Sequence, residues 1–175
     1  IIDGPLSIGR MRRGLLRRMG DLSNQRILDV GSGTGTMSVM IKQAFPGAQV
    51  VGLDGDPQIL EIACAKARTL GLEIQFEQGM SFELPYPEDS FDVVLTSMML
   101  HHLTRDDKQT TAREMYRVLR LGGQLFGADF AAPRPCPANE YEIFRPNFTP
   151  KEIKDSQQVD MRGLGHARIA AVPLT

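Results

Sequence analysis

The residues best suited to chemistry lie in one short run, ILDVGSGTGT, from Ile27 to Thr36. Its apolar start predicts a buried strand. Its glycines at alternate positions predict a tight turn that a ligand can approach without meeting a Cβ atom. A helix that begins at about Thr34 would aim its first N–H groups and its positive dipole end at that ligand. The run therefore predicts a binding site for a nucleotide-like ligand.

The spacing of the glycines separates two classes of such ligands. A dinucleotide site favours G-x-G-x-x-G, whose last glycine allows close helix–strand packing under a pyrophosphate. The glycines here are Gly31, Gly33 and Gly35. Because Thr36 stands where the last glycine would be, the spacing favours a ligand without a pyrophosphate, whose amino-acid part lies against the turn. Asp54, which ends the next apolar strand, can accept ribose hydroxyls in either class.

The elements that position these residues alternate between strand and helix as far as residue 130. Strands are predicted at residues 27–30, 49–53, 72–78, 91–100 and 123–130, and helices at 34–45, 57–70 and 106–119. This alternation predicts βαβ units, a parallel sheet and right-handed crossovers. In such sheets ligands bind at the carboxyl ends of the strands near the switch point, where the glycine turn and Asp54 both fall.

The two ends of the chain follow other patterns. Residues 1–20 predict an amphipathic helix with five arginines: Arg10, Arg12, Arg13, Arg17 and Arg18. This helix either packs Leu15 and Met19 on the core with solvated arginines, or turns one arginine toward an anionic group such as a cofactor carboxylate or an acidic substrate. Prolines predict a long loop or partly extended flap at residues 131–150. A short helix from Thr149-Pro150 and a last strand at residues 168–174 are expected after it.

The composition is that of an ordinary globular protein, with 175 residues, 42% of them hydrophobic and 23% charged. We expect one domain over residues 1–175, with the N-terminal helix at 1–20, a cofactor-binding core at 24–130, and a loop with a C-terminal helix or strand at 131–175. A net charge of −1 argues against bulk attraction to nucleic acid or to an anionic membrane. We find no signal-peptide pattern and no apolar run near the roughly 18 residues that span a bilayer.

The cysteines and the first residue give two further expectations. The two cysteines, Cys64 and Cys136, form no metal or disulfide framework, which predicts a cytoplasmic location and no metal site. The chain begins with Ile1 rather than methionine, so we expect further N-terminal sequence in the natural protein.

Four motifs in series give a specific resemblance: LDVGSGTG, VVGLD, LPYPEDSFDVVLTSMMLHHL and EMYRVLRLGGQL. Over about residues 20–130 the chain resembles class I S-adenosylmethionine-dependent methyltransferases, and within them the small-molecule branch of ubiquinone and menaquinone C-methyltransferases. The resemblance implies a Rossmann-like, doubly wound α/β fold with a mostly parallel sheet and helices on both faces. The tail is short for the family's last helix and final hairpin, so a shortened C-terminal hairpin is expected.

The function implied by the resemblance is methyl transfer from S-adenosyl-L-methionine to an unidentified small-molecule acceptor. Two alternatives stay open: a non-catalytic domain that binds S-adenosylmethionine or S-adenosylhomocysteine, and a nicotinamide-dependent oxidoreductase, against which Thr36 argues. We expect no nucleic-acid partner and no transmembrane segment, and we leave an oligomer open.

The resemblance also assigns cofactor-binding residues along the chain. The methionine part would lie against Asp29, Gly31, Ser32, Gly33 and Gly35. Asp54 would take the ribose hydroxyls, Gly55 and Asp56 would lie near the adenine or ribose edge, and Ser97 and Met98 would flank the methionine or the sulfonium.

One assigned position departs from the family. The family commonly shows an aspartate that accepts the adenine amino group before the L-P-x loop, whereas this chain has Gly79-Met80-Ser81. Adenine would then be held by apolar contact with Met80 and by the backbone N–H of Ser81. We expect weaker cofactor binding or relaxed adenine selectivity as a result.

The sequence offers only weak candidates for a catalytic base, His101, His102 and Tyr86. The interpretation favoured over a catalytic role is that the two histidines form the structural end of the fourth strand; Tyr86 is alternatively a surface ring. No base is required if the acceptor is already anionic.

Overall fold

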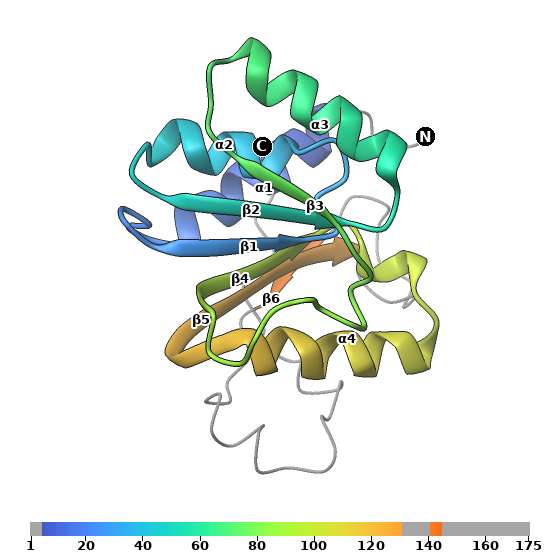
Figure 1. Cartoon of the computed structure of the whole chain (residues 1–175). Coiled ribbons are helices and arrows are strands. Elements are labelled where there is room, and N and C mark those ends of the chain that lie inside the picture. Colours follow the sequence, from blue (N-terminus) through green and yellow to red (C-terminus); the bar gives the residue numbers. More distant parts are fainter. Residues whose placement is uncertain (1–4, 131–140, 145–175) are drawn as a thin grey trace.

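The computed structural model describes residues 5–130 and 141–144, and the side chains of residues 8–129. These residues form a six-stranded sheet with the order β3-β2-β1-β4-β5-β6 (Figure 1). The strands are β1 (Arg26–Val30), β2 (Gln49–Asp54), β3 (Gln75–Gln78), β4 (Phe91–Ser97), β5 (Leu119–Phe130) and β6 (Tyr141–Phe144). The first five strands pair in parallel, and β6 pairs antiparallel with β5.

Helices cover both faces of this sheet. They are α1 (Pro5–Arg18), α2 (Thr36–Ala44), α3 (Pro57–Thr69) and α4 (Arg105–Val118), with a 3₁₀ turn η1 (Leu100–His102). Figure 1 shows α1, α2 and α3 on one face and α4 on the other. The chain moves outward from β1 to β3 and then returns to place β4 beside β1, so the switch point lies between β1 and β4. The doubly wound, mostly parallel sheet predicted from the sequence is confirmed.

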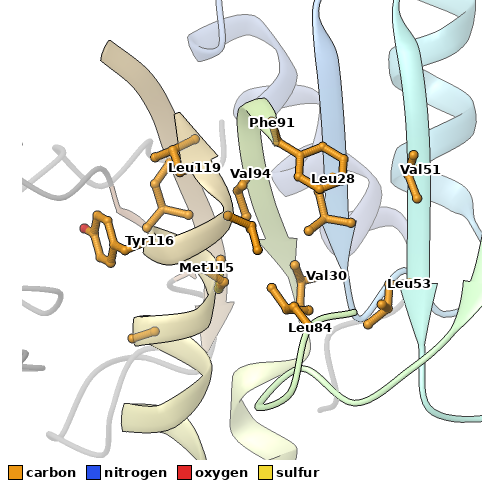
Figure 2. Packing of buried hydrophobic residues seen from close by; sticks show 13 residues of the cluster. Leu28, Val30, Val51, Leu53, Leu84, Phe91, Val94, Met115, Tyr116 and Leu119 are labelled. Carbon is orange, nitrogen blue, oxygen red and sulfur yellow. The ribbon is translucent and has the colours of Figure 1, made fainter. Parts of the chain in front are cut away.

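Two apolar layers hold the sheet from its two sides. Between the sheet and α4, residues such as Leu28, Val94 and Tyr116 form one cluster (Figure 2). On the opposite face, α1 contributes Met11 and Leu15 to a second cluster with α2 and the strands. Each fully buried aliphatic or aromatic side chain stabilises the fold by about 1.5–3 kcal/mol. The ends of the strands are therefore fixed in position, and with them the loops that follow.

Local signals predicted the start of α3 correctly. Asp56 is its N-cap, because Oδ1 of Asp56 accepts a hydrogen bond from the backbone N–H of Gln58 at 2.9 Å, and Pro57 occupies the first turn. The helix ends before Gly71, whose φ of +64° only glycine adopts easily. The N-terminal helix also forms as predicted, with Leu15 and Met19 buried.

Several boundaries differ from the predicted ones. Helix α2 begins at Thr36 instead of Thr34, since Gly35 is still left-handed, and β3 begins at Gln75 instead of Leu72. Strand β4 ends at Ser97, because the chain turns at the next residue. The prediction that His101 and His102 end this strand is therefore wrong, as both lie in η1.

The start of β5 and the region after residue 130 need two further corrections. The sequence predicts a helix to residue 119 and a fifth strand from residue 123, but α4 ends at Val118 and β5 begins at Leu119. Gly122 and Gly123 interrupt the ladder, since the β4–β5 register shifts there and Gly122 has a φ of +80°. The region predicted at 131–150 as a long loop or partly extended flap includes β6, the antiparallel partner of β5, and its other residues lie outside the described ones. The helix predicted from Pro150 and the strand predicted at 168–174 lie outside the described residues.

Candidate cofactor site

The three glycines of the turn differ in what surrounds them, although all are left-handed. A Cβ on Gly31 would collide with the side chain of Met99, and one on Gly35 would lie 2.7 Å from the ring of Phe76. A Cβ on Gly33 would meet no described atom within 4 Å. Packing therefore requires the first and third glycines, whereas the space over Gly33 is open to a ligand.

The carboxylate of Asp54 lies beside Gly33, at the end of β2. Its Oδ2 accepts a hydrogen bond from the backbone N–H of Gly33 at 2.8 Å, and its Oδ1 accepts one from the N–H of Asp56 at 3.1 Å. These two donors fix the orientation of the carboxylate. Because an ionised carboxylate has about four acceptor sites, this one retains capacity for ribose hydroxyls.

The outer side of the glycine turn is held by α3. Lys66 donates from Nζ to the carbonyl oxygen of Thr34 at 2.6 Å and to Oγ1 of Thr36 at 3.0 Å. Burial and then the charge of Arg12 lower the pKa of Lys66. These contacts support the shape of the turn from outside, which reduces the ordering that a ligand must impose.

Asp29, near the end of β1, carries an unsatisfied oxygen. Its side chain is 1% exposed, and Oδ2 accepts a hydrogen bond from Ser38 Oγ at 2.6 Å. Its Oδ1 is buried and has no hydrogen-bond partner among the described residues. Burial raises the pKa of Asp29 to about 6, whereas the Ser38 hydrogen bond and the charge of Arg12 lower it. A buried carboxylate oxygen without a donor is costly, which makes it a fitting partner for a ligand's ammonium group.

Arg12 brings a positive charge from α1 to the same place. Its Nε donates to Oγ of Ser97, at the end of β4, over 3.2 Å. Burial lowers the pKa of Arg12, and the charge of Asp29 raises it. The apolar face of the N-terminal helix packs on the core as predicted. One arginine of the five lies near a carboxylate of the protein itself, and an arginine that faces a cofactor or substrate anion stays a prediction. Together, Arg12 and Asp29 offer a cation and an anion, as an amino acid's carboxylate and ammonium require.

The region assigned to adenine has an apolar surface. The side chain of Met80 is 47% exposed, and its Sδ lies 3.0 Å from the place that a Cβ would take on Gly55. The hydroxyl of Ser81 is turned to the interior, where it shares a buried hydrogen bond of 2.9 Å with Thr111. The structure therefore brings Gly55 and Met80 together, with no carboxylate at residue 80.

The predicted sulfonium region lies where β4 ends. Ser97 is buried in contact with Arg12, and Met98 adopts a φ of +61°, which is uncommon for a residue with a side chain. The N–H of Met98 donates to the carbonyl oxygen of Ala128 in β5 at 2.8 Å, which fixes this turn. The ends of β1, β2 and β4 thus bring Asp29, Asp54 and Ser97 to one edge of the sheet, the carboxyl edge.

Among the three candidate bases, Tyr86 has a side chain that is held at both its hydroxyl and its ring. Its hydroxyl donates to Oε2 of Glu77 at 2.7 Å, and its ring packs edge-on against Phe91 with centroids 4.9 Å apart. Burial, followed by the Glu77 hydrogen bond and charge, raises the pKa of Tyr86 well above its usual range. These contacts favour a structural role for this phenol.

His101 has a carboxylate partner that the sequence interpretation missed. Nδ1 of His101 lies 2.7 Å from Oδ1 of Asp129, near the end of β5, and the ring of His102 lies against that of His101 with centroids 4.0 Å apart. The sequence shows only that Asp129 is an acidic residue near the end of the predicted fifth strand. This position alone does not indicate that its partner is a histidine 28 residues earlier.

This sheet and its glycine turn define a class I S-adenosylmethionine-dependent methyltransferase domain. A family model described as a methyltransferase domain matches residues 27–123, more than half of the chain. The chain belongs to this family, and within it the chain resembles the ubiquinone and menaquinone C-methyltransferases.

Three known proteins illustrate the similarity. The demethylmenaquinone methyltransferase of Thermus thermophilus is 37% identical over 136 residues, which are 76% of this chain and 61% of that protein. The ubiquinone/menaquinone biosynthesis C-methyltransferase of Pectobacterium carotovorum is 33% identical over 125 residues, or 70% of this chain and 49% of that protein. The solved structure of the YcgJ protein of Bacillus subtilis superposes with a TM-score of 0.62 at 29% identity, over 75% of this chain and 53% of that one. The chain thus spans about half to three-fifths of the length of these relatives.

Within the described residues, we find no helix that is both long enough and apolar enough to cross a membrane.

Proposed function

We propose that this chain transfers the methyl group of S-adenosylmethionine to a small acceptor with a phenol- or quinol-type ring. The observation that carries the proposal is the electrostatic pairing of Asp29 and Arg12 at the carboxyl edge of the sheet, together with the open space over Gly33 in the turn that follows β1. An unsatisfied buried carboxylate oxygen suits the ammonium group of the cofactor, and the guanidinium suits its carboxylate. Asp54, held by two backbone donors, would take the ribose hydroxyls.

The contribution of the chain to the reaction is positioning. When bound, S-adenosylmethionine supplies a methyl group already activated by the sulfonium charge. Asp29, Arg12 and Asp54 would hold the two polar ends of the cofactor, which leaves the sulfonium near Ser97 and Met98. Orientation of this kind can account for several kcal/mol of a reaction barrier. Covering the site from water would strengthen each of these charged contacts.

The choice of acceptor class rests on the relatives. Two of them are named for demethylmenaquinone and for ubiquinone and menaquinone biosynthesis. The family match over residues 27–123 includes Asp29, Asp54 and Ser97 at the carboxyl edge. An aromatic alcohol of this type becomes a strong carbon or oxygen nucleophile once it loses a proton. The predicted cytoplasmic location, the predicted single domain and the assigned cofactor residues remain part of this proposal.

Isothermal titration tests the cofactor part of the proposal. S-adenosylmethionine and S-adenosylhomocysteine should bind, and NAD should give no heat. Arg12→Gln should weaken binding of S-adenosylmethionine about ten- to a hundredfold, because a hydrogen bond to a charged group contributes about 1.5–3 kcal/mol. Arg13→Gln is the matched control, since Arg13 lies next to it on α1 and is exposed; its affinity should equal that of the wild type.

Methyl transfer is then measured with labelled S-adenosylmethionine and 1,4-naphthalenediol as the acceptor. Label in the organic phase supports the proposal. Binding without transfer to this diol or to other hydroquinones favours the non-catalytic cofactor-binding alternative. If neither S-adenosylmethionine nor S-adenosylhomocysteine gives heat of binding, the proposal is wrong.

A further inference from the structure

We infer that His101, oriented by Asp129, is the general base that takes a proton from the methyl acceptor. This inference rests on the proposed function, and it adds a residue pair that the cofactor site does not need. His101 lies in η1 and Asp129 near the end of β5, and both stand at the carboxyl edge.

The carboxylate of Asp129 holds His101 at two points. Oδ1 accepts a hydrogen bond from the ring at Nδ1 over 2.7 Å, and Oδ2 accepts one from the backbone N–H of His101 over 3.2 Å. An ionised carboxylate only accepts hydrogen bonds, so the proton of a neutral ring belongs on Nδ1. The other ring nitrogen, Nε2, then carries the lone pair that a base requires. Two-point attachment also fixes the plane of the ring.

The exposure of the two side chains suits these roles. The side chain of His101 is 31% exposed, so an acceptor can reach it, whereas that of Asp129 is only 11% exposed. A shielded carboxylate that orients an accessible imidazole, and stabilises it once protonated, is the arrangement by which enzymes prepare a histidine base.

The pair also lies next to the predicted sulfonium region. Ala128, which precedes Asp129, pairs in register with Ser97 at the end of β4. The chain then turns at Met98, and η1 places His101 over the end of β5. An acceptor that approaches the sulfonium over Ser97 would thus meet the histidine on the β5 side.

The proposed step moves a proton to His101 and a methyl group to the acceptor. His101 takes the proton of an acceptor O–H, and the electron pair left on the acceptor forms a bond from carbon or oxygen to the methyl carbon. The bond between the methyl carbon and sulfur breaks, and its electron pair stays on sulfur as a neutral thioether. The imidazolium, stabilised by Asp129, then releases its proton to solvent.

The first test needs no turnover. In a ¹⁵N-histidine-labelled sample of the full chain, a long-range ¹H–¹⁵N spectrum should show the proton of the neutral His101 ring on Nδ1. His101→Gln assigns the signal, and Asp129→Asn should shift it. A neutral ring protonated on Nε2 would overturn the inference.

The second test measures turnover with 1,4-naphthalenediol. His101→Gln should lower kcat about a hundredfold or more, with the Kd for S-adenosylmethionine within twofold of the wild-type value, which also shows that the variant is folded. Asp129→Asn should lower kcat at least tenfold with the same unchanged Kd. Added imidazole should restore part of the activity of His101→Ala, an effect that a purely structural role does not produce.

The outcomes separate this inference from the proposed function. If the wild type transfers no methyl group, both fail. If the wild type is active and His101→Gln is equally active, only the inference fails. His102→Gln distinguishes the two adjacent rings: a loss as large as that of His101→Gln would also overturn the assignment to His101.

Discussion

The backbone N–H of Gly33 donates to Oδ2 of Asp54 over 2.8 Å, so the glycine turn after β1 and the end of β2 form one unit. This bond connects the residue whose open side faces a ligand with the carboxylate assigned to the ribose. Substitutions at either residue should therefore change the affinity for the cofactor. Their effects on the stability of the fold can be measured separately.

Asp54→Ala should weaken binding of S-adenosylmethionine about ten- to a hundredfold. The variant removes the acceptor of two backbone donors and of the ribose hydroxyls, and hydrogen bonds to a charged group contribute about 1.5–3 kcal/mol. Isothermal titration measures the change. Asp21→Asn is the control, since Asp21 is an exposed residue of the loop that leads into β1, at the opposite edge. An equal affinity in both variants would show that Asp54 has no part in the site.

Gly33→Ala should abolish most cofactor binding while destabilising the fold by only about 1–2 kcal/mol, the cost of a left-handed alanine. Gly71→Ala is the matched control, because Gly71 is also left-handed with open space around it, but lies after α3 at the other edge of the sheet. Thermal unfolding should show similar losses of stability for the two variants, and titration should show a loss of affinity for Gly33→Ala alone. Similar affinities would place the ligand elsewhere.

The buried carboxylate of Asp29 predicts a pH dependence of stability. Its folded-state pKa, about 6, lies above its ordinary value of 3.8, so the folded chain binds this proton more tightly than the unfolded chain. Stability from this group is fully present below about pH 4, and it falls as the pH rises to about 6. The stability lost in this way totals about 3 kcal/mol, and the contribution of Asp29 to stability stays constant at higher pH.

Asp29→Asn isolates this contribution, because its amide oxygen can still accept from Ser38 and does not titrate. Urea unfolding from pH 4 to pH 7 should show the variant gaining about 3 kcal/mol in stability relative to the wild type. Parallel stability curves for the two proteins would mean that this carboxylate has an ordinary pKa.

Met80→Asp should tighten binding of S-adenosylmethionine by up to about 3 kcal/mol, because it supplies the charged acceptor for the adenine amino group that this chain lacks. Met80 is already exposed next to Gly55, so the substitution leaves no cavity. Met80→Asn, with an uncharged acceptor, should give a smaller gain. Weaker binding in Met80→Asp would show that adenine does not lie on residue 80.

Features that depend on neighbouring residues could be predicted from the sequence. The glycine turn, the strand end at Asp54 and the cap at Asp56 each follow from a few adjacent residue types, and the structure has all three. The start of β5 was misplaced because pairing with β4 extends the strand back across Gly122, which local propensity alone does not favour.

Contacts between distant segments were beyond the reach of sequence patterns. Arg12 meets Ser97 across 85 residues, so the sequence showed five equivalent arginines and the fold selects one. His101 and Asp129 meet only because η1 folds over the end of the neighbouring strand. The hydrogen bond of Tyr86 to Glu77 likewise depends on where a proline-rich loop crosses β3.

The unequal surroundings of the three glycines have a consequence for how such domains diverge. Gly31 and Gly35 are enforced by Met99 and Phe76, so any descendant that still folds must keep them or change those partners. Gly33 meets no side chain of the fold, so beyond the modest cost of its left-handed backbone it is enforced only by what binds there. A gene copy released from selection for cofactor binding would accumulate side chains at residue 33 first and would keep the other two glycines. The middle glycine is thus a marker of retained function, and its neighbours are markers of retained fold.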